Sequence, residues 1–212
     1  MSKNDHPYHY TNPKSLSQRL LDFGVPIVLF FIYFQFYNFG KITPSEMVKT
    51  SGLLAIALLS LSLVIGPLCR FFPTLDVLKA HRKVWGIASF FAAVVHMGLI
   101  FYYFLKLDVT KLFDTSNPKF LGLSAGLLAL LILLVVTLSS IKQVLHSLDP
   151  KVWKFIQTTS YLALILAVTH FYLVESKDGI LVIKRLLGQL TFGFAFFAIL
   201  LKLFVTLIPK KK

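Results

Sequence analysis

Apolar residues in this chain form six long runs that short polar segments separate. The runs cover about 20–37, 48–68, 84–104, 120–141, 153–174 and 186–208. About 20 apolar residues in a helix cross a hydrocarbon core of about 30 Å. The pattern therefore predicts an all-α integral membrane bundle of six transmembrane helices. It also predicts a polar lead at 1–18, a membrane domain at 19–208 and a basic tail at 209–212.

The composition agrees with a polytopic membrane protein. Hydrophobic residues make up 56% of the 212-residue chain and the mean hydropathy is +0.74, values outside the range of an ordinary soluble domain. One cysteine, Cys69, leaves neither a disulfide framework nor a cysteine metal site. No cleavable signal peptide is expected, because the first 18 residues are polar and the apolar run after them is long enough to remain a helix. No internal repeat is evident.

The positive charge is distributed according to topology. A net charge of +13 suggests nucleic acid, but the basic residues lie between apolar runs rather than along one stripe, so the expected partner is the lipid bilayer and not nucleic acid. Six spans place both termini on one side. That side holds 14 of the 22 Lys and Arg residues, and the other holds 8. The positive-inside rule then predicts cytoplasmic termini and a multi-pass protein of the cytoplasmic membrane.

Aromatic residues are concentrated at the end of the first run, in the segment FFIYFQFYNF at 30–39. Aromatic side chains are common where a membrane helix meets the headgroups, so this segment is predicted to form an interfacial belt. Residues 180–185, after a short charged loop, are also expected at the interface.

Two histidines lie inside predicted spans. Starting the third and fifth spans near Val84 and Phe155, His96 lies 12 residues in and His170 lies 15 residues in. These positions are about 18 and 22 Å deep at 1.5 Å per residue, so both side chains are expected at one level in the outer half. Small residues precede them on the same helix faces: Ser89, Ala92, Ala93, Ala163 and Ala167. A flat macrocycle fits against such faces.

The residues by themselves leave two interpretations of this pair. A haem iron accepts two axial imidazoles, each ligating through one nitrogen while the other nitrogen donates a hydrogen bond. Alternatively, each histidine is a packing residue that is hydrogen-bonded to a neighbouring span. An ionisable side chain inside a membrane is a functional candidate in either case.

An ordered series of short motifs resembles a known family. The series is G-L-L-A, L-S-L and G-P-L-C-R from Gly52 onward, then Arg82-Lys83, Gly86 and His96, then Thr137-Leu138-Ser139, then Trp153, Tyr161 and His170. This pattern resembles the ferric reductase-like transmembrane domain over about 52–171, with a core at about 48–174. Within that family it is most similar to the haem-binding membrane subunit of the periplasmic methionine-sulfoxide reductase system.

The resemblance implies a function. In that family the positions matching His96 and His170 are haem b ligands, and the domain passes electrons across the membrane. Members that use NADPH carry a soluble flavin and nucleotide domain after the last helix, and none is expected here because the chain ends at Lys212. The expected protein is an electron-transfer subunit that exchanges electrons with a redox partner protein, rather than a complete enzyme.

Two other classes compete with this function. The first is a non-redox scaffold or assembly subunit that keeps the bundle without haem. The second is a transporter, which the lack of Asp, Glu, Lys or Arg deep in a span disfavours.

One position departs from the family pattern. The family commonly has a further histidine where this chain has Gln157, and an amide is a weak ligand for iron, so one haem b per chain is expected. An electron from the cytoplasm would then need another carrier, such as a flavin or quinone near Gln157, Thr158 and Arg82, unless the donor approaches from the outer side.

Two further histidines and four lysines have expected locations outside the spans. His81 and His146 are expected to be solvated loop histidines. Candidate partners for the haem propionates on the outer side are Lys106, Lys111, Lys119 and Lys177.

Overall fold

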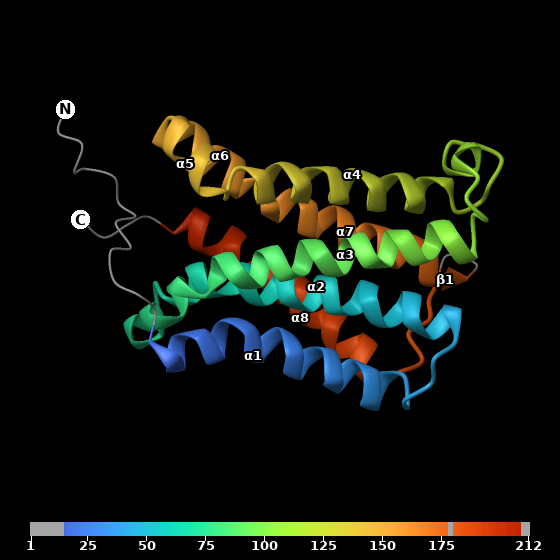
Figure 1. Ribbon diagram of the computed structural model, residues 1–212, viewed down its shortest axis with the longest axis horizontal. Helices are drawn as coiled ribbons and strands as arrows, with labels where there is room; N and C mark the ends of the chain where they lie inside the picture. The colour runs from blue at the N-terminus through green and yellow to red at the C-terminus, as the bar shows by residue number, and fades with distance from the viewer. Residues whose placement is uncertain (1–14, 178–179, 209–212) are drawn as a thin grey trace.

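Six helical segments of the computed structural model, which describes residues 15–177 and 180–208, are long and apolar enough to cross a membrane (Figure 1). They are α1 (Leu16–Ile32, continued by a π-helical turn η1 at Tyr33–Tyr37), α2 (Pro44–Leu68), α3 (Arg82–Tyr103), α4 (Phe120–Leu138), the pair α6 (Pro150–Thr158) and α7 (Ser160–Glu175), and α8 (Leu186–Leu207). The predicted multi-pass helical bundle is confirmed.

Shorter elements connect these spans. They are the 3-10 helices η2 (Pro73–Ala80) and η3 (Val109–Leu112), the helix α5 (Lys142–Ser147), and two-residue strands β1 (Ser176–Lys177) and β2 (Ile180–Leu181). The strands pair antiparallel, so the start of the segment expected at the interface forms a small hairpin with the end of the fifth span.

Capping side chains set where the first two spans begin. Ser15 Oγ accepts from the Gln18 amide, and Gln18 Oε1 accepts from the Ser15 amide, which forms a capping box. Thr43 Oγ1 accepts from the Glu46 amide at 3.4 Å. The first helix therefore begins at Leu16 instead of about residue 20. Most of the predicted lead (1–14) and all of the basic tail (209–212) lie outside the described residues.

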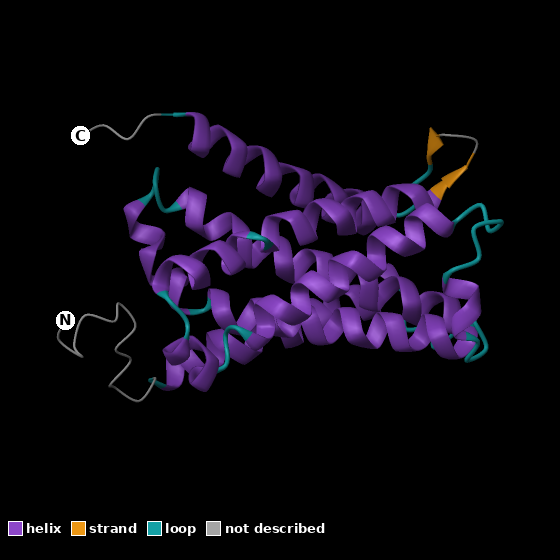
Figure 2. Ribbon diagram, turned by 90° about the horizontal axis from the view of Figure 1, so that it is seen from above, coloured by secondary structure: helices purple, strands orange, loops and turns teal. Residues whose placement is uncertain are grey.

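Helix α2 is the centre of the bundle. In its most apolar window 72% of residues are buried, against 11–17% in the other five spans. It packs most extensively on α3 and α8 and also contacts α1 and α7, while α4 packs on α7 (Figures 1 and 2). Two antiparallel helix pairs, α2·α3 and α4·α7, therefore lie side by side.

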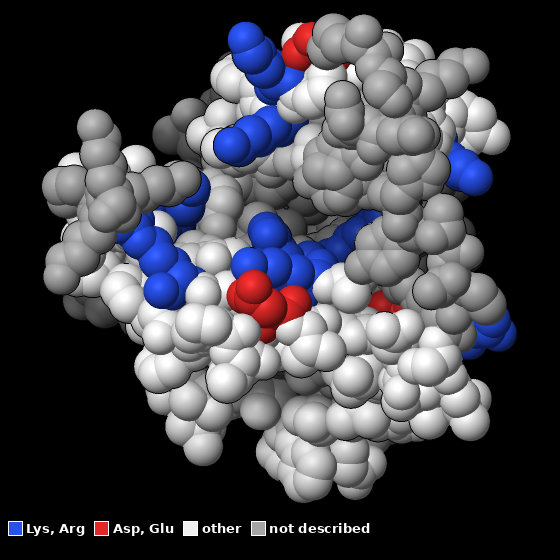
Figure 3. Space-filling model, turned by 90° about the vertical axis from the view of Figure 1, so that its left-hand side faces the viewer, with Lys and Arg blue, Asp and Glu red and all other residues white. Residues whose placement is uncertain are grey.

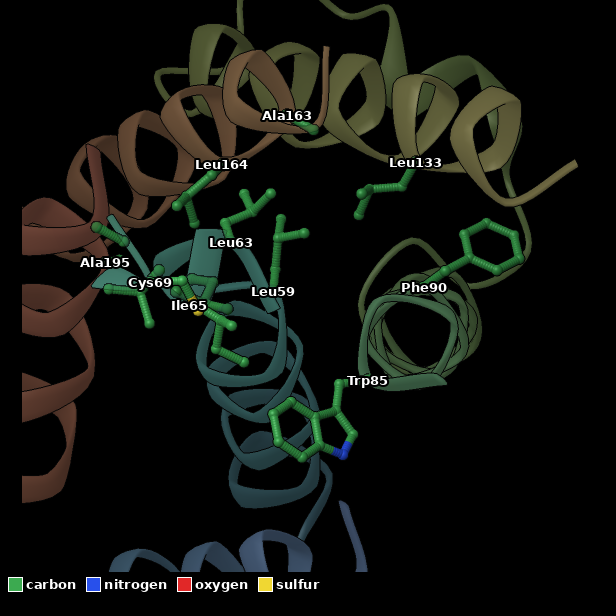
Figure 4. Close-up of a cluster of buried hydrophobic side chains, with 13 residues drawn as sticks. Leu59, Leu63, Ile65, Cys69, Trp85, Phe90, Leu133, Ala163, Leu164 and Ala195 are labelled. Carbon is green, nitrogen blue, oxygen red and sulfur yellow. The ribbon is translucent and has the colours of Figure 1, made fainter. Parts of the chain in front are cut away.

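Small residues allow these helices to approach closely. Figure 4 shows Leu59 and Leu63 of α2 directed toward Leu164 of α7 and Leu133 of α4. Ala163, Ala195 and Ala198 have no exposed surface. Small side chains favour helix association in membranes, where packing replaces the hydrophobic driving force.

The fifth span is broken, which the sequence pattern did not predict. Helix α6 ends at Thr158 and α7 begins at Ser160. The hydroxyls of Thr158 and Thr159 donate to the carbonyls of Lys154 and Ile156 at 2.8 and 2.7 Å. Such bonds from threonine to the preceding turn compete with the helical ladder and bend helices.

The predicted aromatic belt is wrong for two of its members. Tyr33 and Tyr37 are buried. The Tyr33 hydroxyl hydrogen-bonds to Thr191 on α8, and the Arg185 guanidinium lies 4.7 Å from the Tyr37 ring centroid. These polar partners inside the bundle satisfy the two tyrosines, so they turn inward instead of toward the headgroups.

His81 is not the solvated loop histidine that was expected. It directly precedes α3 and is completely buried, with Nδ1 2.7 Å from Oδ1 of the buried Asp22 on α1. Its ring stacks on Trp85, whose Nε1 donates to the Leu21 carbonyl at 3.1 Å. The pair fastens α1 to the start of α3, and it places an acidic side chain inside a span, contrary to the sequence argument. His146 is exposed, as expected.

Replacement of Asp22 by leucine is expected to destabilise the bundle. It leaves His81 buried beside an apolar group, and removal of one member of a buried pair typically costs about 3–5 kcal/mol. Thermal unfolding in detergent should show a clearly lower midpoint. Asp76→Leu is the matched control, because its ion pair with Lys79 at 2.8 Å is exposed and should contribute little. Equal midpoints for the two variants would contradict the structural role of the buried pair.

Candidate functional site

The structure brings the two histidines predicted in the spans together. His96 lies on α3 and His170 on α7, and their ring centroids are 6.0 Å apart with the ring planes at 84°. They come from different helix pairs, so each pair supplies one imidazole. Both rings line the same cavity.

Both imidazoles are held in the same tautomer. His96 Nδ1 lies 2.8 Å from the Val48 carbonyl on α2, and His170 Nδ1 lies 2.8 Å from the Gly122 carbonyl on α4. A carbonyl oxygen only accepts, so each Nδ1 carries the proton and donates it. Each Nε2 then has a free lone pair, and neither forms a hydrogen bond among the described residues. A neutral imidazole with one nitrogen anchored in this way is suited to bind a metal.

The cavity between the pairs has a volume of about 680 Å³ and is mostly apolar. Of the small residues predicted beside the histidines, Ala93, Ala167 and Ser89 line it. Ala92 packs against a second cluster around Leu53, and Ala163 is buried in the main core, so neither lines the cavity. Fewer small residues therefore line the cavity than helical spacing suggested.

Two lysines lie along the cavity at the end of the bundle opposite to the start of α3. One is Lys119, which the sequence suggested, and the other is Lys49, which it did not. Lys49 Nζ is 3.8 Å from a Glu175 carboxylate oxygen. Lys106 and Lys111 do not line the cavity, and the side chain of Lys177 lies outside the described part of the chain.

Gln157, at the position of the additional family histidine, makes structural contacts. Its amide nitrogen lies 3.1 and 3.0 Å from the hydroxyls of Ser139 and Ser140 and 3.3 Å from the Val136 carbonyl. These bonds join α6 to the end of α4. Arg82, where a second carrier was considered, donates to the Ser62 carbonyl at 2.7 Å.

A haem fits the donor set better than a bare metal ion. Within residues 15–177 and 180–208, no group of three or more His, Cys, Asp or Glu side chains is placed to hold a metal. A macrocycle supplies its own in-plane ligands and needs only axial ones. Imidazoles that share a metal have centroids about 6 Å apart, since two bonds of about 2 Å and two ring radii of about 1 Å separate them. The observed spacing meets this requirement.

Two glycines that the sequence analysis did not connect with the site lie against the rings. Gly52 faces His96, and Gly126 faces His170. Gly52 entered the sequence analysis only as the first residue of the motif series, and Gly126 did not enter it. The sequence signal was present in the shared letters GLLA at 52–55 and 126–129.

The fold and the site define a multi-pass membrane protein with two facing imidazoles inside the bundle. The family model described as "Ferric reductase like transmembrane component" matches residues 51–168, more than half of the chain and all of α3. The chain belongs to this family.

A mouse (Mus musculus) protein named metalloreductase STEAP2 is also similar. The two are 30% identical over 165 residues, which cover 63% of this chain and 34% of the mouse protein. The chain therefore spans about a third of the length of the curated relative that it matches.

Proposed function

We propose that this chain is a haem b-binding membrane protein that transfers electrons within or across the membrane to a redox partner. The observation that carries the proposal is the pair of neutral imidazoles, 6.0 Å apart, whose Nδ1 atoms are anchored and whose Nε2 atoms have no hydrogen bond in the described chain. A scaffold without a cofactor gives no reason for two anchored imidazoles from different helix pairs to line one mostly apolar cavity inside the bundle.

The chain's own residues have separate roles in this proposal. Bound haem supplies one-electron exchange at its iron. His96 and His170 would hold the haem iron through Nε2, and their carbonyl partners hold the rings and would raise the basicity of each Nε2. The apolar lining excludes water, which affects the reduction potential. Lys49 and Lys119 are placed to pair with the acidic haem substituents.

The subfamily and the second electron carrier are also proposals. The family membership supports an electron-transfer role, and the resemblance described above favours a subunit like the one that serves the periplasmic methionine-sulfoxide reductase. The metalloreductase name belongs to a longer protein, of which the similarity covers only 34%, so reduction of metal ions is a candidate activity of that whole protein. A flavin or quinone near the cytoplasmic end remains the proposed second carrier for a donor on that side.

The distribution of charge supports a proposed membrane orientation. Figure 3 shows the end of the bundle at which α3 and α6 begin, where blue side chains outnumber red ones. The described basic residues of this end include Arg19, Arg70, Lys79, Arg82, Lys83, Lys142, Lys151 and Lys154. Because excess Lys and Arg favours the cytoplasmic side, we propose that this end and both termini are cytoplasmic and that the histidine cavity opens toward the outer side.

Removal of either histidine should abolish haem binding. His96→Ala and His170→Ala each delete one axial nitrogen, so haem content should fall at least about tenfold and the Soret band of the purified protein should disappear. Absorption spectra with and without dithionite provide the measurement. His146→Ala is the control, since His146 is exposed on α5. Wild-type haem content in both test variants would refute the ligand assignment.

The haem content should be one per chain, and Gln157→His should not increase it. The Gln157 side chain faces the serines of α4 rather than the cavity, and the buried His81 is already paired with Asp22. Pyridine haemochrome analysis against protein concentration measures the ratio. A ratio near two in the wild type would mean that a second pair of ligands exists, and a ratio of two in the variant alone would mean that an inner pocket survives.

A reporter that functions only in the cytoplasm should be active when it is fused after Lys212. A second fusion in the loop around Lys111, between α3 and α4, should report the outer side. The opposite result for both fusions would reverse the proposed orientation and place the cavity mouth at the cytoplasmic face.

A further inference from the structure

We propose that Gly52 and Gly126 are positioning residues: each forms a backbone seat that fixes one imidazole, and the two seats hold the rings perpendicular at the iron. The spectroscopic part of this inference rests on the proposed haem-binding function. The prediction that each seat fixes the tautomer of its histidine does not rest on haem binding, because it concerns the protein chain alone.

The first seat is formed by α2 and accepts His96 from α3. The Val48 carbonyl takes the Nδ1 proton at 2.8 Å, and one helical turn later Gly52 lies under the ring. A Cβ built on Gly52 would stand 2.8 Å from Cε1 and 2.9 Å from Nδ1 of His96. Real Cβ atoms do not approach this closely, so any larger residue would push the ring off its carbonyl.

The second seat has the same construction on α4 and α7. The Gly122 carbonyl takes the Nδ1 proton of His170 at 2.8 Å. A Cβ on Gly126, one turn later, would stand 2.7 Å from Nδ1 and 3.0 Å from Cε1 of that ring. Acceptor, glycine and histidine therefore have the same relation in both helix pairs.

The sequence repeats with the structure. The acceptor, the glycine and the histidine of the second seat each follow their counterparts by 74 residues. The letters GLLA occur at 52–55 and 126–129, and AVVH at 93–96 corresponds to AVTH at 167–170. The expectation of no internal repeat is therefore wrong. Each helix pair contains a half-site, which consists of a carbonyl acceptor, a glycine and a histidine, and the two half-sites match. Equivalent half-sites imply that alanine at either glycine has a similar effect.

The seats decide the ring angle. A hydrogen bond fixes which ring edge meets the carbonyl, and the glycine contact on the ring prevents rotation, so the 84° between the planes is a property of the two seats. Parallel axial imidazoles interact with the same iron d orbital and split it from its partner. Perpendicular rings act on both orbitals equally, which produces a ferric low-spin signal with one large g value instead of a rhombic signal.

The test compares Gly52→Ala and Gly126→Ala with Gly98→Ala. An added Cβ at Gly98, which is on α3 two residues after His96, meets nothing within 4 Å, so it controls for the methyl group itself. Electron paramagnetic resonance of the ferric proteins should show the large-g signal in wild type and in Gly98→Ala. Both seat variants should lose most of that signal to rhombic or high-spin species, with a shifted midpoint potential.

A second measurement needs no haem. Solid-state ¹⁵N spectra of histidine-labelled protein, produced without haem, should show Nδ1 protonated and Nε2 unprotonated for His96 and His170 in the wild type. Each seat variant should show a mixture of tautomers at its own histidine only. The wild-type ¹⁵N spectrum and the wild-type electron paramagnetic resonance spectrum do not depend on recovery of a folded variant.

The outcomes separate this inference from the proposed function. A wild-type protein without haem refutes the function but leaves the tautomer test decisive for the seats. Three results would overturn the role of the glycines. They are a rhombic signal from the haem-loaded wild type, protonation at Nε2 in the haem-free protein, and seat variants that match Gly98→Ala in every spectrum.

Discussion

A buried imidazole needs an acceptor for its N–H, and within a membrane bundle the available acceptors are mainly helix carbonyls. Those carbonyls are already bonded within the helix and are shielded by side chains one turn away. A glycine one turn away has no side chain and leaves the carbonyl accessible. His96 and His170 both meet this condition, at the Val48 and Gly122 carbonyls. The same contacts require close packing of α3 on α2 and of α7 on α4, so the orientation of the imidazoles and the packing of the helices are coupled.

The two ends of the bundle differ in their construction. The end at which α3 begins is closed by polar contacts, which include the buried His81 and Asp22 pair and the bonds of Gln157 to α4. The other end is hollow between the helix pairs, and the charged side chains Lys49, Lys119 and Glu175 line the cavity there. This asymmetry agrees with the proposed single cofactor, and α2, which contacts most of the other spans, connects the two ends.

Family membership and site geometry support the same class of function from independent directions. The family match rests on residues 51–168 and therefore does not include His170. The structure nevertheless places His170 opposite His96 in a seat that duplicates the first. Two matching half-sites on two helix pairs account for how one short chain presents two equivalent imidazoles to one cavity. The family match suggests a membrane electron-transfer role, and the paired half-sites agree with the proposal that this role uses a cofactor between the two histidines.

The sequence by itself determined the six spans, the family and the two histidines that meet in the cavity, because apolar run length and an ionisable residue within a run are local properties. It did not determine that Tyr33, Tyr37 and His81 are buried, nor that the fifth span breaks at Thr159. Those outcomes depend on which helix face meets a partner far along the chain, such as Asp22 for His81, 59 residues away. The tautomer and ring angle of the histidines were decided in the same way. They need a carbonyl and a missing Cβ on another helix, and only the packing of α2 on α3 and of α4 on α7 brings these within hydrogen-bond distance.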